Sequence, residues 1–313
     1  MRRDLTRTAV ALGALVSLAG SGLGGASVHQ AVAGAAPHVC LTPSPPGAAA
    51  RGAVVGRGHD TRGITATQQR AIETRTRRIL AARTARRTTA NRLDHVPVYV
   101  HVMTSRTGAG NVTDSQIAQQ ITVLNQTYSG HDVDRPGRLD TGVRFYLAGA
   151  NRYANSTWHT DGDSETYRAR TRQGGPNALN IWVVHFAYLG IATFPWDDAA
   201  DPSIDGIRVE YAAFPGGSAT HYDQGETVTH ETGHWLGLYH TFQGGCSAEG
   251  DSVSDTAAQA SPSSGCPTGR DSCTAPGKDP IHDYMDYSYD SCYYQFTAGQ
   301  SARIQEMWTA YRA

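Results

Sequence analysis

Short apolar and β-branched runs recur through the middle of the chain, and each predicts a strand. The first run alternates β-branched residues with others, and the later runs are short and apolar, as buried strands are. The predicted strands cover residues 95–103, 142–147, 179–184, 189–194 and 206–211. Pro195 marks the fourth as an edge strand or a strand end, because proline cannot donate to a ladder. We therefore expect one sheet of about five strands.

Helical spacing occurs before, between and after these strands. Residues 114–128 carry apolar side chains on one face and follow a capping residue, Thr113 or Asp114, which predicts a helix packed on the sheet. Residues 67–85 also have a helical pattern, with few apolar side chains among many arginines. A capping-box pattern at residues 297–300 opens a last helix.

Charge divides the chain at about residue 95. Residues 1–95 carry 14 Arg against 4 acids, and residues 96–313 carry 12 Arg and one Lys against 24 acids, which gives +10 and −11. We expect the two parts to attract each other, and the alternative is that the Arg-rich part is a solvated tail. Because these arginines lack interleaved aromatic residues and a recognisable module, we expect no nucleic-acid partner.

The N-terminal part divides into an export signal and a second segment. Several arginines precede an apolar run at residues 8–19 that is too short and glycine-rich for a membrane span. Residues 1–36 therefore predict a secretory signal peptide, which leaves no membrane attachment after its removal. Residues 37–92 are interpreted as an Arg-rich pro-segment and residues 93–313 as the folded domain.

Residues 230–240 have the sequence H-E-T-G-H-W-L-G-L-Y-H, and this spacing is the strongest chemical signal in the chain. On a helix, His230 and His234 lie one turn apart on one face, so both imidazoles can reach one tetrahedral zinc ion. A continued helix would carry His240 about 15 Å along from His230 and onto another face. The helix must therefore end before His240. Gly237 can end it, because glycine enters the left-handed region cheaply.

Glu231 lies beside these histidines and predicts hydrolytic chemistry. Three neutral imidazoles leave zinc one open position for a water, which becomes far more acidic than bulk water. Glu231 would take its proton and hand it to the leaving amine of a cleaved peptide bond. A catalytically silent extracellular binding module is the alternative, but such a module has no need of a general base. Hydrolysis of a non-peptide bond is disfavoured, because the predicted edge strand suits an extended peptide.

The extended motif is that of the metzincins, whose second mark is a methionine in a tight turn beneath the metal. Residues 279–288, which include Met285, resemble that turn. This segment, residues 229–242 and the Cys-rich loop between them are similar to the pappalysin-like (cytophagalysin) metalloproteases, and the resemblance covers about residues 96–312.

The resemblance implies an α+β fold with a metzincin-type catalytic domain. Its upper subdomain, about residues 93–237, would hold a twisted mixed sheet of about five strands with a backing helix and an active-site helix. Its lower subdomain, about residues 238–313, would be loop-rich, stapled by disulfides and closed by a helix.

The resemblance also implies roles for individual residues after the zinc motif. Met285 would form the apolar floor of the site, and Tyr287 would donate to the transition-state oxyanion unless it is one more packing tyrosine. Asp283 stands where relatives often carry Asn. An accessible Asp290 would favour Arg or Lys after the scissile bond, and Ser291 is the alternative lining residue.

Cysteines add a prediction of cross-links. Four of the five follow the zinc motif, and in an oxidising compartment they predict disulfides, with three pairings open to sequence alone. The resemblance implies the pairs Cys246–Cys273 and Cys266–Cys292. The fifth, Cys40, lies in the predicted pro-segment. Its thiolate could occupy the open zinc position as a latency switch, and an incidental free thiol is the alternative.

Residues 250–256 offer closely spaced oxygens, among them Asp251 and Asp255, that suit calcium. The resemblance supports a calcium site because relatives bind calcium in this region, and solvated loop carboxylates are the alternative. Together these features predict a secreted, monomeric zinc endopeptidase that is made as a zymogen and acts on proteins or peptides.

Overall fold

The computed structural model describes residues 63–86, 92–131, 139–198 and 200–313, which belong to one compact unit. The predicted signal peptide and Cys40 lie outside the described residues, as does much of the predicted pro-segment. Within the described part of the chain, no helix is long and apolar enough to cross a membrane.

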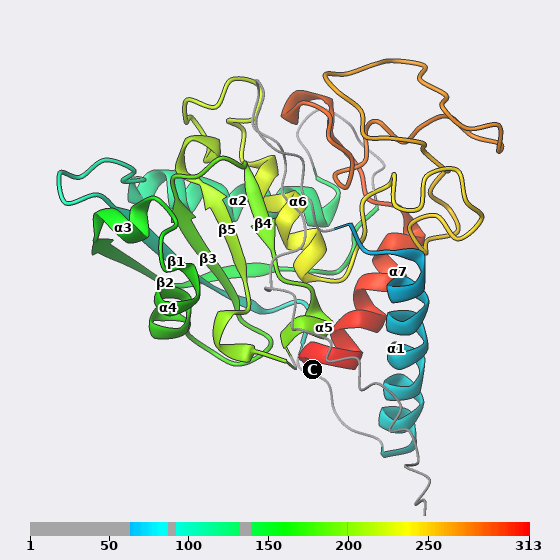
Figure 1. The fold of residues 1–313 in the computed structure, drawn as a ribbon, viewed down its shortest axis with the longest axis horizontal. Coiled ribbons are helices and arrows are strands. Elements are labelled where there is room, and N and C mark those ends of the chain that lie inside the picture. Colours follow the sequence, from blue (N-terminus) through cyan, green and yellow to red (C-terminus); the bar gives the residue numbers. More distant parts are fainter. Residues whose placement is uncertain (1–62, 87–91, 132–138, 199) are drawn as a thin grey trace, which may run out of the picture. The chain divides into compact units, whose positions relative to one another are not determined.

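A five-stranded sheet forms the centre of the domain (Figure 1). Its strands are β1 (Val96–Thr104), β2 (Phe145–Ala154), β3 (Leu179–Val184), β4 (Gly190–Ala192) and β5 (Ile207–Glu210). They lie in the order β2-β1-β3-β5-β4. The first four in this order run parallel, and the edge strand β4 runs antiparallel to β5. The predicted mixed sheet is confirmed, and β4 is at its edge.

β2 differs most from its prediction. The strand begins at Phe145 instead of residue 142 and continues to Ala154 instead of ending at residue 147. Beyond Phe145 its side chains are exposed or half-buried, because β2 forms the other edge of the sheet. An edge strand outside the core carries no long apolar run, so hydrophobicity alone did not reveal its second half.

Two helices pack on one face of the sheet. The backing helix α2 (Asp114–Ser129) begins with a capping box at Thr113, as predicted. Together with the active-site helix α6 (Glu226–Trp235), it shares an apolar core with Ile181 and Val183 of β3. Tyr128 of α2 donates its hydroxyl to the carbonyl of Thr229, so α2 supports α6 directly.

The opposite face carries short helices that the sequence pattern did not predict. Trp182 and Val184 of β3 alternate with the core residues and pack against Tyr167 of α4 (Ser164–Thr171). The helix α3 (Ser156–His159) is a single turn, as is α5 (Pro195–Asp198), whose Trp196 packs instead against Tyr239 and Met307. Segments this short and polar leave no helical period to detect. Short 3-10 turns occur at Pro202–Ile204, Tyr211–Ala213 and Asp290–Cys292.

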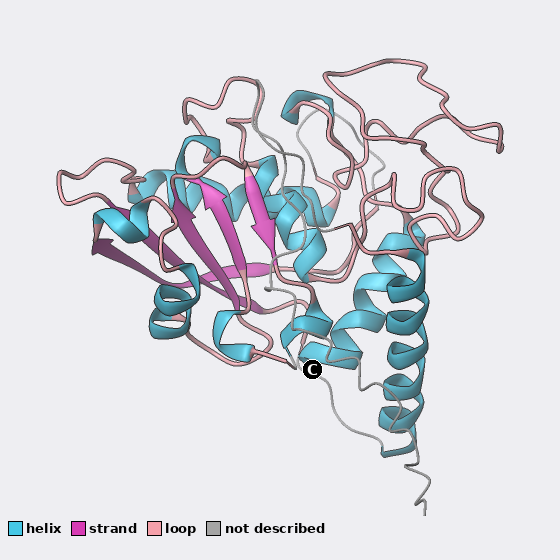
Figure 2. Cartoon of the chain, in the orientation of Figure 1, coloured by secondary structure: helices cyan, strands magenta, loops and turns pink. Residues whose placement is uncertain are grey.

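Loops dominate the chain after α6 (Figure 2). Disulfides join Cys246 to Cys273 and Cys266 to Cys292, with Cα–Cα distances of 5.5 and 5.6 Å. This is the pairing that the family resemblance implied. Because the loops have little regular backbone pairing, the cross-links restrict the unfolded chain where the core contributes least.

The last helix, α7 (Ala298–Met307), and the π-helical turn Trp308–Arg312 pack behind α6 as well as on the loops. Arg312 donates to both carboxylate oxygens of Asp205 at 2.9 and 3.1 Å, and its Nε donates to the carbonyl of Trp235 at 2.9 Å. All three residues are fully buried. The prediction of a helix docked on the loop subdomain omitted this second contact, which links residues far apart in sequence.

The described helix of the predicted pro-segment, α1 (Ala66–Arg86), lies along α7 and the turn that follows it (Figure 1). Ile72 of α1 and Ile64, which precedes the helix, join a cluster with Tyr239 and Met307.

His101 in the middle of β1 is a structural histidine. The ring is fully buried, and its Nε2 lies 2.9 Å from the Oδ1 of Asn180 on β3. Because that oxygen can only accept, Nε2 carries the proton and Nδ1 is bare. Burial lowers the pKa of His101 from 6.5 to about 4.

We predict that His101 makes the domain lose stability between pH 6.5 and 4. Between pH 6.5 and about pH 4, His101 is protonated in the unfolded chain but stays neutral in the folded chain. The contribution of neutral His101 to the free energy of unfolding is therefore complete above pH 6.5 and is lost as the pH falls to about 4. The full loss amounts to about 3 kcal/mol. Urea unfolding of the wild type and of His101→Gln at pH 7, 6 and 5 isolates this group, because their difference cancels the other titrating residues. Parallel pH dependences in the two proteins would contradict the assignment.

Candidate active site

The active-site helix α6 carries His230 and His234 and ends where the sequence predicts. Both histidines are fully buried, and the chain leaves the helix at Leu236. Gly237 has a φ of +98°, and a Cβ there would lie 2.5 Å from Cγ of Met307. The left-handed backbone and the close approach of α7 both require glycine at this position. The turn brings His240 back to the helix.

The three imidazoles converge on one point. The Nε2 of His234 lies 3.1 Å from the Nε2 of His230 and 3.1 Å from the Nε2 of His240. The outer nitrogens of two of them are held by carbonyls: Nδ1 of His230 donates to the carbonyl of Tyr284 at 2.6 Å, and Nδ1 of His234 donates to the carbonyl of Leu238 at 2.8 Å. These bonds fix the tautomer that presents a bare Nε2 to the centre. Such a donor set fits one tetrahedral metal ion.

Glu231 lies under the edge strand β4. The residue is fully buried, and a Cβ on Gly190 of β4 would lie 2.4 Å from its Cγ. Any side chain larger than hydrogen at Gly190 would therefore displace the carboxylate. Gly190 was not predicted to have a role, although a glycine inside a predicted edge strand is the signal that marks such a close approach.

Met285 lies directly beneath α6. A Cβ on Gly233, between the two helical histidines, would lie 2.4 Å from the Met285 sulfur, and Met285 is fully buried. The carbonyl that orients His230 belongs to Tyr284, the preceding residue. This turn therefore supplies both the apolar contact under the helix and the hydrogen bond that fixes one imidazole.

Asp283 holds the turn that contains Met285. Its Oδ1 accepts from the amide of Met285 at 2.8 Å and from Nε2 of Gln300 at 2.9 Å. Burial raises the pKa of Asp283 to about 8.

Aromatic rings surround the histidines. The ring centroid of Tyr287 lies 4.8 Å from His240 and 5.7 Å from His230, and Phe242 stacks on His240 at 4.6 Å. Phe194 meets His234 edge-on at 5.3 Å. The structure thus brings Tyr287 beside the predicted ligands. Sequence reasoning missed both phenylalanines, because their position depends on how the loops fold back over α6.

Asp290 is only 2% exposed. Its Oδ2 accepts from the amide of Gln224 at 3.0 Å, and its own amide donates to the carbonyl of His221 at 3.0 Å. Ser291, the alternative lining residue, is exposed. Which of the two meets a substrate side chain stays a prediction.

The two candidate calcium ligands differ. Asp251 is 3% exposed, and its Oδ1 accepts from the amide of Val253 and the hydroxyl of Thr256, both at 3.0 Å. Its Oδ2 is buried without a hydrogen-bond partner among the described residues, and burial raises the pKa of this carboxyl to about 7. Asp255 is exposed and accepts from Thr297 and Gly299 at the start of α7. Only Asp251 has the buried oxygen that a cation would satisfy.

The parallel sheet with an antiparallel edge strand, the histidine-bearing helix and the methionine turn define a metzincin-type metallopeptidase. A family model described as pregnancy-associated plasma protein-A matches residues 185–309. The chain belongs to this pappalysin-like family of metalloproteases, as the resemblance indicated.

Curated relatives support this assignment over most of the chain. An extracellular metalloprotease of Neurospora crassa is 46% identical over 233 residues, which cover 72% of this chain and 78% of the relative. Extracellular metalloprotease 1 of Coccidioides posadasii is 45% identical over 225 residues, 70% of this chain and 78% of the relative. The protein is accordingly an extracellular metalloendopeptidase.

Solved structures agree in fold. Mature mirolysin of Tannerella forsythia, in complex with a cleaved peptide, has a TM-score of 0.60 at 32% identity and covers 69% of this chain and 92% of its own. A promirolysin variant of the same organism has a TM-score of 0.64 at 29% identity, covering 77% of this chain and 89% of its own. These neighbours confirm the predicted metzincin-type fold.

Proposed function

We propose that the protein hydrolyses peptide bonds with a zinc ion held by His230, His234 and His240, and that Glu231 is the general base and acid. The observation that carries this proposal is the convergence of three buried imidazoles, whose ligand atoms all lie within 4.8 Å of one another, beside a buried carboxylate. Secretion as a zymogen completes the proposal, since a promirolysin structure is among the neighbours.

Each group around the site has a separate role in peptide hydrolysis. When bound, zinc supplies Lewis acidity, which makes water easier to deprotonate and polarises the scissile carbonyl. Glu231 accepts the proton of the attacking water and returns it to the leaving amine. The free edge of β4 pairs with an extended substrate, as in other strand-addition complexes, and Gly190 leaves room for Glu231 beneath it.

We predict that Glu231→Gln retains stoichiometric metal but loses about 10²–10⁴-fold in kcat/KM, because the amide cannot accept the proton of water. The measurement pairs metal analysis with cleavage of a mixed peptide library. His230→Gln is the matched comparison, and it should lose metal as well as activity. Near-normal activity of Glu231→Gln would remove this residue from the mechanism, and a metal-loaded wild type that cuts no peptide would favour a silent binding module.

Tyr287 is proposed to donate its hydroxyl to the oxyanion that forms during the reaction. Its ring centroid lies within 5.7 Å of those of two of the proposed ligands, and the residue is half-buried. We predict that Tyr287→Phe lowers kcat by about 10²-fold with little change in KM, as loss of one oxyanion donor does. Tyr289, which stacks on His221 instead, provides the control Tyr289→Phe with near-normal kcat. Equal effects of the two substitutions would assign Tyr287 to packing.

Calcium at Asp251 is a separate part of the proposal. A cation would satisfy its buried Oδ2 and remove the cost of ionising a carboxyl whose pKa burial has raised. We predict that millimolar calcium raises the Tm of the wild type by about 2–8 °C, and that Asp251→Asn abolishes this shift. Asp271→Asn, in an exposed part of the loops, should keep it. An undiminished calcium shift in Asp251→Asn would place any calcium elsewhere.

Latency and the boundaries of the pro-segment stay predictions, because Cys40 lies outside the described residues. The proposed substrates are proteins or peptides, and the proposed active form is a monomer without nucleic-acid partners.

A further inference from the structure

α1 packs on the domain through one face, which the pattern of apolar residues in the sequence does not reveal. Its buried and half-buried positions recur at helical spacing, at Gln69, Ile72, Glu73, Thr76, Ile79, Leu80 and Arg83. Polar side chains interrupt the apolar ones on this face, so the helix does not have the continuous apolar stripe of an ordinary core helix. The arginines Arg75, Arg77 and Arg78 are exposed. The positive charge of this segment therefore points largely to solvent.

Two ion pairs join described side chains of α1 to the domain, and the shorter and more buried of them has the opposite polarity to the net charges of the two parts. Glu73 of α1 accepts from Nη2 of Arg303 at 2.7 Å, and the two side chains are 24% and 5% exposed. Arg70 pairs with Glu249 at 3.4 Å, but both side chains are more than half exposed. Exposed pairs contribute little, whereas removing one partner of a buried pair leaves a charge without compensation.

Arg303 connects Glu73 to the turn that precedes the third proposed metal ligand. Its Nε donates to the carbonyl of Gly237 at 2.8 Å, and its guanidinium lies 4.6 Å from the ring centroid of Tyr239. The Tyr239 hydroxyl donates to the same Glu73 carboxylate at 3.4 Å. One guanidinium thus holds both a carboxylate of α1 and the backbone turn that returns His240 to the helix.

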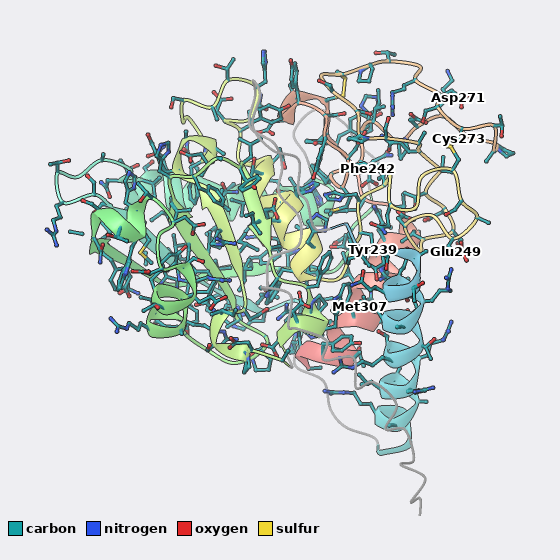
Figure 3. All side chains as sticks on the ribbon, in the orientation of Figure 1. Tyr239, Phe242, Glu249, Asp271, Cys273 and Met307 are labelled. Atoms are coloured by element: carbon teal, nitrogen blue, oxygen red, sulfur yellow. A yellow bond between two sulfur atoms is a disulfide. The ribbon has the colours of Figure 1, made fainter. Side chains whose placement is uncertain are left out.

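Other contacts place α1 on the same side of the domain. Nε2 of Gln69 donates to the carbonyl of Gly250 at 3.0 Å and to the hydroxyl of Ser252 at 2.7 Å. Thr76, 2% exposed, lies 2.9 Å from the hydroxyl of Tyr311. In Figure 3, Tyr239 and Met307 lie between the active-site helix and α1. α1 therefore binds next to the turn at Gly237. The edge strand β4 and the Met285 turn contact other parts of α6.

We propose that α1 is a brace that remains bound to the domain after the chain is cut between α1 and β1. Through Glu73 and Arg303 it holds the Gly237 turn in the shape that metal binding needs. This inference rests on the proposed metal site and on the proposed pro-segment, and it separates α1 from any inhibitory role of the residues before it. The domain surface around Arg303 and Tyr239 is thus occupied by α1 of the same chain.

The test uses the full chain with a specific protease site in place of residues 87–91. After nicking, native mass spectrometry and gel filtration at low micromolar concentration measure how much of the fragment that contains α1 stays with the domain. We expect most of it to co-elute. Complete separation of the fragment, with an unchanged Tm and unchanged metal content of the remaining domain, would overturn the proposal.

Glu73→Gln and Arg70→Ala supply the matched pair of variants on the same helix. Loss of the buried charge pair should increase the rate at which a chelator removes zinc from the nicked protein by at least about tenfold, whereas loss of the exposed pair should leave it unchanged. The chelation rate is independent of peptidase activity. Equal rates in Glu73→Gln and the wild type would refute the brace but leave the proposed protease intact. A retained helix in a protein without peptidase activity would refute the proposed function and support the brace.

Discussion

The structure depends on ending one helix at the right residue. α6 presents His230 and His234 on one face, but a third imidazole can join them only if the chain reverses before His240. Gly237 allows the reversal with its positive φ, and α7 fills the space that a side chain would need there, since Met307 lies against it. The convergence of the three histidines is thus a property of this turn as much as of the motif.

Several buried charged residues hold the end of α6 and the Gly237 turn in place. Asp205 and Arg312 are fully buried and joined by two hydrogen bonds, and both contact Trp235, the last residue of α6. Arg303 contacts the carbonyl of Gly237. Breaking a buried pair costs much more than breaking an exposed one, because the remaining charge keeps its desolvation penalty. The C-terminal helix therefore serves the active-site helix, even though it begins in the loop-rich part of the chain.

Net charge was a poor guide to how α1 meets the domain. The opposite charges of residues 1–95 and 96–313 predict attraction, yet the arginines Arg75, Arg77 and Arg78 of α1 are exposed. The buried contact is made by Glu73, one of the few acids of that segment. Long-range attraction between solvated charges is screened, whereas a single partly buried carboxylate beside a buried guanidinium is not.

The sequence by itself determined the elements whose signals are local. The spacing of the histidines, the stop at Gly237, the capping boxes at Thr113 and Thr297 and the apolar runs of β1 and β3 each lie within a few residues of one another. The family resemblance added the turn at Met285 and the disulfide pairing. Only the tertiary structure decided that Gly190 covers Glu231, that Phe242 stacks on His240, and that Arg303 and Arg312 hold the end of α6. These contacts join residues tens of positions apart, and their partners are chosen by packing, which leaves no periodic trace in the chain.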